Sequence, residues 1–218
     1  MSALLLDLGT REYGEVWELQ KSLVAKRSLG SIPDVLLLVE HESVITLGRR
    51  TSHENFRPQN IPVFQVERGG DATYHGPGQL VGYPIMKLAD NDVHKYLRQL
   101  EETLIRTVGR YGIEGARRDG HTGVWVGNKK VASIGVAISS WVTYHGFALN
   151  VNTEMSHFHL IKPCGLDPDT LSSMKQLLGH DVGMGDVKKT YVAEFSEVFG
   201  VTLEKKELED LLKIESAT

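Results

Sequence analysis

Residues 123–151 read GVWVGNKKVASIGVAISSWVTYHGFALNV and carry a strong strand pattern. The stretch divides into GVWVGNKK at 123–130, VASIGVAIS at 131–139 and WVTYHGFALNV at 141–151, each rich in β-branched or aromatic residues. Such residues favour strands. The N-K-K sequence at 128–130 suits a hairpin turn between the first two segments. We therefore predict consecutive strands here.

Further strands are predicted on the N-terminal side of this stretch. The apolar runs are LLLDLG at 4–9, DVLLLVEH at 34–41, SVITLGRR at 43–50, VFQVERGG at 63–70 and QLVGYPI at 79–85. The runs at 34–41 and 43–50 follow each other so closely that we expect them to pair with one another.

Helical spacing alternates with these strands. Residues 11–27 form one amphipathic helix, and a second begins at the capping residues Asn91 and Asp92. Asp167 followed by Pro168 predicts a further helix start, and 202–216 reads as a helix with a solvated, charged face. Because strands cluster in the middle of the chain and helices are interspersed, we predict an α+β fold with a mixed sheet.

Composition limits the class of protein. The 218 residues suit a single domain, 1–218, with 41% hydrophobic and 24% charged residues. A net charge of −4 gives no reason to expect nucleic acid as a partner. The absence of a long apolar run or a basic, apolar N-terminus predicts no membrane span and no signal peptide. One cysteine fits a reducing compartment, so we expect a cytoplasmic protein.

The densest polar sequence is ERGGDATYHGPGQ at 67–79. Its glycines allow an irregular backbone that approaches a ligand closely. It matches neither a phosphate-binding P-loop nor a dinucleotide-binding fingerprint. A solvated hairpin loop and a binding loop both fit these residues.

A second cluster combines KKVASIG at 129–135 with YHGFALN at 144–150. The small residues Ser133, Gly135, Gly146 and Ala148 leave room for a ligand against the sheet, with Lys130 beside it. Alternatively, Lys130 is a turn lysine and the small residues allow a helix to pack tightly.

Cys164, in IKPCGL at 161–166, is the only cysteine of the chain. A lone cysteine is often an inert core residue, but one between proline and glycine lies on a turn, where a thiol can face a cleft. A metal site built from Cys164 with His145, His157 and His159 lacks the C-x-x-C or H-E-x-x-H spacing, so we expect no metal.

Taken together and in order, these motifs identify a family. TLGR at 46–49, RGGDATYHGPGQLVGYP at 68–84, KVASIGV at 130–136, HGFALN at 145–150 and PCG at 163–165 resemble the lipoyl(octanoyl) transferases, in the lipoate and biotin protein ligase superfamily. The resemblance spans nearly the whole chain. The family usually has valine at Ala72 and isoleucine at Leu166, and neither change touches a reacting atom.

The resemblance implies a mixed sheet flanked by helices and a cytoplasmic enzyme of lipoate biosynthesis. It would transfer an octanoyl group from octanoyl-acyl carrier protein to a lysine of apo lipoyl domains, those of 2-oxo-acid dehydrogenases and of the glycine cleavage H protein. It would use no cofactor. Cys164 matches the family's nucleophile, which forms an acyl thioester, and Lys130 matches its partner. An adjacent ammonium favours the reactive thiolate. The implied substrate contacts are Arg68, Gly69, Gly70, Asp71, Ala72, Thr73, Tyr74, His75, Ser133, Ile134, Gly135, Gly146, Phe147 and Ala148.

Two other functions fit the same fold. An ATP-dependent lipoate or biotin ligase would use the lysine without needing the cysteine. A non-catalytic module that binds carrier proteins or lipoyl domains would need neither. The presence of both Lys130 and Cys164 favours the transferase.

Overall fold

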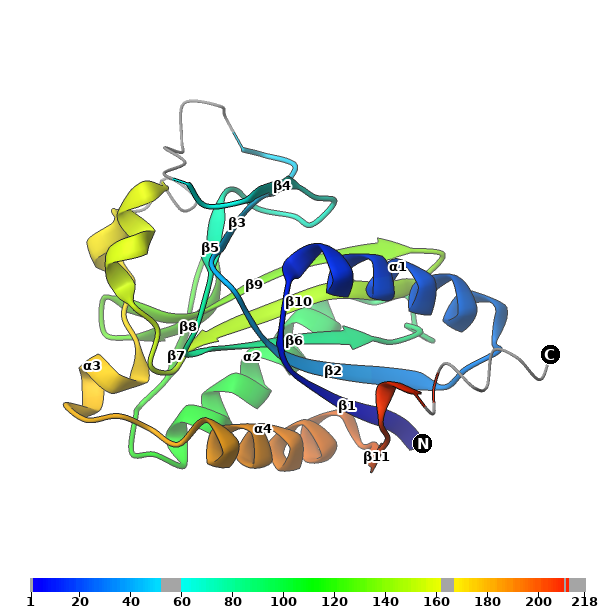
Figure 1. Ribbon diagram of the computed structural model, residues 1–218. Coiled ribbons are helices and arrows are strands. Elements are labelled where there is room, and N and C mark those ends of the chain that lie inside the picture. Colours follow the sequence, from blue (N-terminus) through cyan, green and yellow to red (C-terminus); the bar gives the residue numbers. More distant parts are fainter. Residues whose placement is uncertain (1, 52–59, 162–166, 210, 212–218) are drawn as a thin grey trace.

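The computed structural model describes residues 2–51, 60–161, 167–209 and 211. Within them, eight strands form one sheet in the order β11-β1-β2-β6-β10-β9-β8-β7 (Figure 1). β1 is parallel to β2 and β11, and the pairs from β2 to β7 are antiparallel, so the predicted mixed sheet is confirmed. The bounds are β1 Ser2–Arg11, β2 Asp34–His41, β6 Gln79–Ile85, β7 Ala116–Arg118, β8 His121–Val126, β9 Lys129–Ser139, β10 Val142–Asn150 and β11 Thr202–Lys205.

Helices cover both faces of this sheet. α1 (Tyr13–Leu29) packs on β2, β6 and β10, whereas α2 (Val93–Gly109) packs on β8, β9 and α4 (Met184–Phe199). The predicted cap of α2 is present, since the Asp92 carboxylate accepts the Lys95 N–H at 2.9 Å. In the described part of the chain no helix is long and apolar enough to cross a bilayer.

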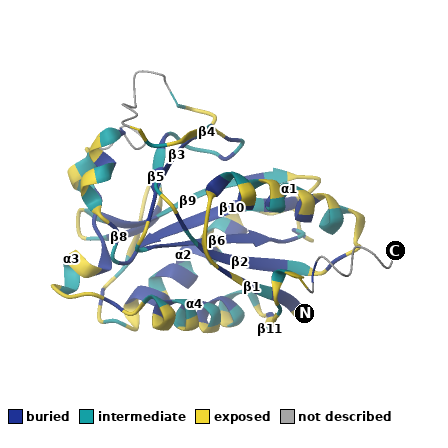
Figure 2. Cartoon of the chain, viewed as in Figure 1, coloured by how far each residue is buried: buried dark blue, intermediate teal, exposed yellow. Residues whose placement is uncertain are grey.

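Two apolar layers result, and the strands between them are buried (Figure 2). In β2, Leu37 and its alternate neighbours face α1, whereas Leu36 and Leu38 face the α2/α4 side. Burial on both faces explains why this strand is a continuous apolar run rather than an alternating one.

A smaller sheet, described as β4 (Val63–Gln65), β3 (Val44–Leu47) and β5 (Thr73–His75), lies beside one end of the main sheet (Figure 1). The predicted pairing of 34–41 with 43–50 is therefore wrong. β2 already has β1 and β6 on its two edges, so β3 leaves the main sheet and pairs with β4 and β5.

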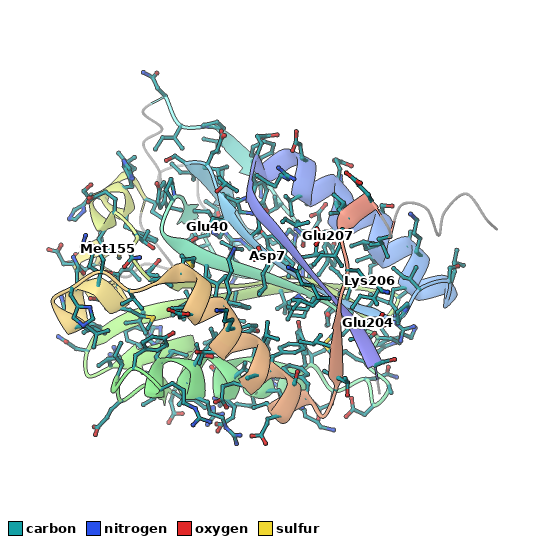
Figure 3. The ribbon with its side chains drawn as sticks, turned by 60° about the horizontal axis from the view of Figure 1, so that its bottom comes forward. Asp7, Glu40, Met155, Glu204, Lys206 and Glu207 are labelled. Carbon is teal, nitrogen blue, oxygen red and sulfur yellow. The ribbon has the colours of Figure 1, made fainter. Side chains whose placement is uncertain are left out.

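Two helix predictions need correction. Thr202–Lys205 is strand β11, parallel to Ser2–Leu5 at the open edge of β1. In Figure 3, the labelled Glu204 lies on this strand and Lys206 directly follows it. Pairing at that edge outweighs the local helical preference. Asp167 caps only the short 3-10 helix Pro168–Thr170, and the chain needs a second cap, Ser173, to begin α3 (Met174–Leu178). Helix α4 was not predicted at all.

Candidate active site

Small side chains of β9 and β10 form a bare patch of sheet. The register pairs Ser133 with Ala148 and Gly135 with Gly146. Alternate residues share a face, so these four residues form one floor. A cavity of about 640 Å³, including its mouth, lies over it. The rest of its lining is Tyr13, Arg68, Asp71, Ala72, Thr73, His75, Tyr83, Lys130, Ile134, His145, Phe147 and Leu171.

Ile134 and Phe147 alternate with the floor residues along β9 and β10, and their side chains lie on the opposite face of the sheet. Both side chains pack in the α2/α4 layer, where the Phe147 ring lies 4.4 Å from that of Tyr191. Because their side chains point through the sheet, what they present to the cavity is main chain. The resemblance had implied direct substrate contacts for both.

Lys130 joins the cavity face because of a β-bulge. Ala132 and Lys130 pair with consecutive residues of β8, so Val131 is an extra residue on β9. Val131 and Ala132 both pack in the α2/α4 layer, and the bulge reverses the alternation of side chains. Lys130 consequently lines the same cavity as Ser133. It is buried, so the alternative of a solvated turn lysine is wrong; the turn itself is Gly127–Asn128.

The Lys130 side chain lies against Trp125 and Gly123. Its Nζ is 5.6 Å from the centroid of the indole ring. A Cβ added at Gly123 would lie 2.6 Å from the Lys130 Cε and 2.3 Å from the Ala132 carbonyl. Gly123 also has a φ of +133°, which other residues rarely adopt. The glycine thus makes room for the lysine.

The Arg68 side chain holds the glycine-rich loop at 67–79 in place through hydrogen bonds to main-chain carbonyls. Its guanidinium donates to the Thr46 carbonyl at 2.7 Å and to the Asp71 carbonyl at 2.7 Å. The next residue, Gly69, donates its N–H to the Val136 carbonyl of β9 at 3.0 Å, which ties the loop to the floor. Gly69 and Gly70 are absent from the cavity lining. A Cβ on Gly48 would lie 2.5 Å from the Gly70 carbonyl oxygen, and one on Gly135 would lie 3.2 Å from the Gly69 carbonyl oxygen, so the missing side chains of Gly48 and Gly135 let the loop pass close to them.

The three side chains of the T-Y-H sequence in strand β5 point toward two different environments. Thr73 and His75 line the cavity. Tyr74 points the opposite way, where its hydroxyl lies 3.0 Å from the Ser43 Oγ and its ring contacts His157 and Phe158. Alternation along the strand separates them. The direct substrate contact that the resemblance implies for Tyr74 is therefore not supported.

Two buried histidines, His75 and His145, line the cavity, and the ring of a third, His41, lies 6.0 Å from that of His75. Burial lowers the pKa of His75 to about 3, and that of His41 and His145 to about 4. For His75, the neighbouring His41 acts in the same direction and the hydrogen bond to Gln79 opposes it. All three imidazoles are neutral at physiological pH.

The sequence did not single out four of the lining residues, Tyr13, Tyr83, His145 and Leu171, as substrate contacts. The Tyr83 hydroxyl donates to the His41 Nε2 at 2.7 Å, because the His41 Nδ1–H donates to the Arg11 carbonyl. A tyrosine inside an otherwise apolar buried strand was the available signal for Tyr83. No local signal marks Tyr13 or Leu171.

His145 has an unusual backbone, with φ of +53°. Its N–H donates to the Gln20 Oε1 at 2.8 Å, and its Nε2 lies 3.3 Å from the Glu67 Oε2. These contacts hold a conformation that costs free energy outside glycine. The metal alternative used this histidine, but His159 instead bonds Asp169 and His157 lies against Tyr74. No group of three metal-binding side chains occurs among the residues that the structure describes.

Cys164 lies outside the described residues. On its two sides along the chain, Ile161 and Leu171 pack in one apolar cluster with Ala72. Leu171 lines the cavity and forms a bridge with Lys130, and the Ser172 N–H donates to the Lys130 carbonyl at 2.9 Å.

Comparison with known proteins identifies the family. The profile described as Lipoyl protein ligase A/B catalytic domain matches residues 12–196. The chain belongs to this family. Within it, an octanoyltransferase from Rubrobacter xylanophilus is 48% identical over 201 residues, 88% of this chain and 91% of that protein. One from Caldicellulosiruptor bescii is 46% identical over 95% of this chain and 97% of that protein. The chain is thus an acyltransferase of the octanoyltransferase group, as the resemblance predicted.

Solved structures of a lipoate-protein ligase and of a biotin protein ligase share the fold. A lipoate-protein ligase A bound with ATP superposes with a TM-score of 0.78 at 17% identity, covering 99% of this chain and 92% of that one. An Aquifex aeolicus biotin protein ligase gives a TM-score of 0.55 at 13% identity, covering 92% and 70%. The predicted superfamily fold is confirmed. Because the ligases are alike only in fold, the ATP-dependent alternative is not favoured.

Proposed function

We propose that this enzyme transfers an octanoyl group from octanoyl-acyl carrier protein to a lysine of an apo lipoyl domain, through a thioester on Cys164. The observation that carries the proposal is the β-bulge that aims Lys130 over the bare floor of β9 and β10. A thiolate nucleophile needs a nearby cation, which Lys130 would supply. An apolar acyl substrate needs an open apolar surface, which the floor of the cavity would supply.

In the first half-reaction, the Cys164 thiolate attacks the carbonyl carbon of the donor thioester. A new C–S bond forms and the bond to the carrier sulfur breaks. The carrier sulfur takes a proton from the Lys130 ammonium and leaves as a thiol, so Lys130 becomes neutral. Lys130, as an ammonium, would favour the thiolate over the thiol, whose ordinary pKa is about 8.5.

In the second half-reaction, the amine of the acceptor lysine attacks the Cys164 thioester. The C–N bond forms, the C–S bond breaks and the amine gives one proton to neutral Lys130, which restores the ammonium–thiolate pair. No external energy source is needed, because an amide is more stable than a thioester. Two bulky carrier proteins then never occupy the site together, which is the advantage of the covalent intermediate.

The floor supplies recognition of the acyl chain. Burying six methylenes at ~0.8 kcal/mol each contributes about 5 kcal/mol. Ser133, Gly135, Gly146 and Ala148 would line that slot, and the loop at Asp71–Thr73 would close it.

The experiment that tests the proposal is intact-mass analysis without ATP. Octanoyl-carrier protein alone should add one octanoyl group to the enzyme, and hydroxylamine should remove it. Added apo lipoyl domain should then acquire the group. Cys164→Ala should never carry it, and normal turnover by that variant would disprove the covalent route. A strict need for ATP would instead indicate a ligase.

A further inference from the structure

A buried chain of hydrogen bonds links His75 to the main chain that holds Lys130. The His75 Nδ1 lies 2.7 Å from the Gln79 Oε1, and the Gln79 Nε2 donates to the Asn150 Oδ1 at 2.9 Å. The Asn150 Nδ2 donates to the Ser172 carbonyl at 3.0 Å. The Ser172 N–H in turn donates to the Lys130 carbonyl. All five residues are buried, and the two ends of the chain, the His75 ring and the Lys130 main chain, belong to residues that line the cavity.

Main-chain carbonyls fix the direction of every bond in this chain, because they only accept. The Ser172 carbonyl requires the NH₂ of Asn150, so the Asn150 oxygen faces Gln79. The Tyr74 carbonyl, 3.2 Å from the Gln79 Nε2, likewise requires the NH₂ of Gln79. The Gln79 oxygen must then face His75. The His75 proton is therefore on Nδ1, and Nε2 carries a lone pair.

The surroundings keep this imidazole neutral. Burial is the main cause that disfavours a positive charge there, and His41, whose ring lies 6.0 Å away, Arg68 and His145 act in the same direction. The Tyr13 ring stacks on the imidazole at 6.0 Å. No described residue forms a hydrogen bond with the His75 Nε2. A neutral Nε2 without a proton cannot donate to an oxyanion; it can only accept. Of the groups that enter the cavity for the second half-reaction, the amine of the acceptor lysine is the one that brings an N–H.

We propose that the His75 Nε2 accepts a hydrogen bond from the attacking amine of the acceptor lysine, and that Gln79 and Asn150 are positioning residues that hold the required tautomer. This inference rests on the proposed octanoyl transfer. Accepting that N–H would hold the amine in the cavity that Lys130 also lines. The bonds made and broken stay those of the second half-reaction, and the proton still passes to Lys130.

Two substitutions of His75 separate the role of each nitrogen. In His75→Asn the amide can keep the bond to Gln79 but has no atom at the position of Nε2. In His75→Gln the amide oxygen can take the place of Nε2. We expect His75→Asn to slow transfer from isolated octanoyl-enzyme to the apo lipoyl domain by ~10²-fold. His75→Gln should recover most of that loss, and formation of octanoyl-enzyme should stay within about two-fold in both variants.

The tautomer of His75 can be measured directly, independently of the transfer reaction. The ¹⁵N chemical shifts of the His75 ring should show a protonated Nδ1 and a bare Nε2 in the unmodified enzyme. Gln79→Met should shift this population toward Nε2–H and slow the amine step, whereas Gln99→Met, which removes only a bond to the Val198 carbonyl, should change neither.

Three results would overturn the inference: a protonated Nε2 in the unmodified enzyme, a normal amine step in His75→Asn, or equal slowing of both half-reactions. Failure of the unmodified enzyme to form octanoyl-lysine would instead contradict the proposed function. The ¹⁵N measurement does not depend on that outcome.

Discussion

Lys130 and Ser133 lie on the same side of β9 although they are three residues apart. In a regular strand an odd separation puts two side chains on opposite faces. The extra residue at the bulge, Val131, removes that conflict. One inserted residue therefore decides whether the Lys130 side chain lines the cavity or packs in the apolar α2/α4 layer.

Replacing Lys130 should raise the pKa of the proposed nucleophile, Cys164. We expect Lys130→Met to slow both half-reactions by ~10²-fold or more, because the thiolate loses its favourable charge and the amine its base. Thiol alkylation measured against pH should move to higher pH. Lys129→Met is the matched control, since Lys129 is half-exposed and bonds the Asp169 carbonyl. Identical alkylation profiles would remove Lys130 from the mechanism.

The glycine beside Lys130 should not tolerate a side chain. Gly123→Ala adds a Cβ 2.3 Å from the Ala132 carbonyl at a φ of +133°. We expect a loss of about 1–3 kcal/mol in the free energy of unfolding and displacement of Lys130. Denaturant unfolding and turnover per folded enzyme measure the two effects. Gly127→Ala also has a positive φ but meets nothing within 4 Å, so it should cost stability without affecting activity.

The floor should set the tolerated length of the acyl chain. Ser133→Val adds bulk at the cavity, so octanoyl transfer should fall about ten-fold, a change of ~1.4 kcal/mol, while butanoyl transfer falls less. Ser139→Val changes the same residue type at the exposed end of β9 and should alter neither rate. Equal loss for both chain lengths in Ser133→Val would argue that the slot lies elsewhere.

Tyr74 should behave as a structural residue, unlike its neighbour His75. Tyr74→Phe removes the hydroxyl that bonds Ser43. We expect a cost of about 0.5–1.5 kcal/mol in thermal or denaturant unfolding, with octanoyl transfer unchanged. A large loss of transfer at normal stability would return Tyr74 to the substrate site.

Acid should lower the free energy of unfolding at pH values well above those at which the buried histidines become protonated in the folded protein. His41 and His75 have folded-state pKa values of about 4 and 3, well below the ordinary value of 6.5. The unfolded chain therefore binds more protons between pH 6.5 and 4. The free energy of unfolding should be greatest above pH 6.5 and fall by ~1.4 kcal/mol per pH unit for each such histidine.

Denaturant titrations from pH 7 to pH 5 measure this slope. His41→Gln, which removes one of the titrating groups, should reduce it by about one proton. A free energy of unfolding that does not change with pH, or a slope that the substitution leaves unchanged, would mean that His41 titrates normally in the folded protein.

The sequence by itself determined the features that depend on local order. Apolar runs predicted β2, β6, β9 and β10, helical spacing predicted the buried face of α1, and Asp92 marked the start of α2. The motif order also identified the family, because residue types at fixed spacing are a property of the chain alone. The small residues that form the floor were visible in the same way.

Only the tertiary structure decided what depends on neighbouring segments. β3 joins a second sheet because β2 already has partners on both edges, and Thr202–Lys205 is a strand because β1 offers an open edge. The bulge at Val131, the opposite directions of Tyr74 and His75, and the tautomer of His75 follow from register and hydrogen-bond partners that are distant in sequence. Local propensities differ by less than these pairings contribute, so the pairings prevail.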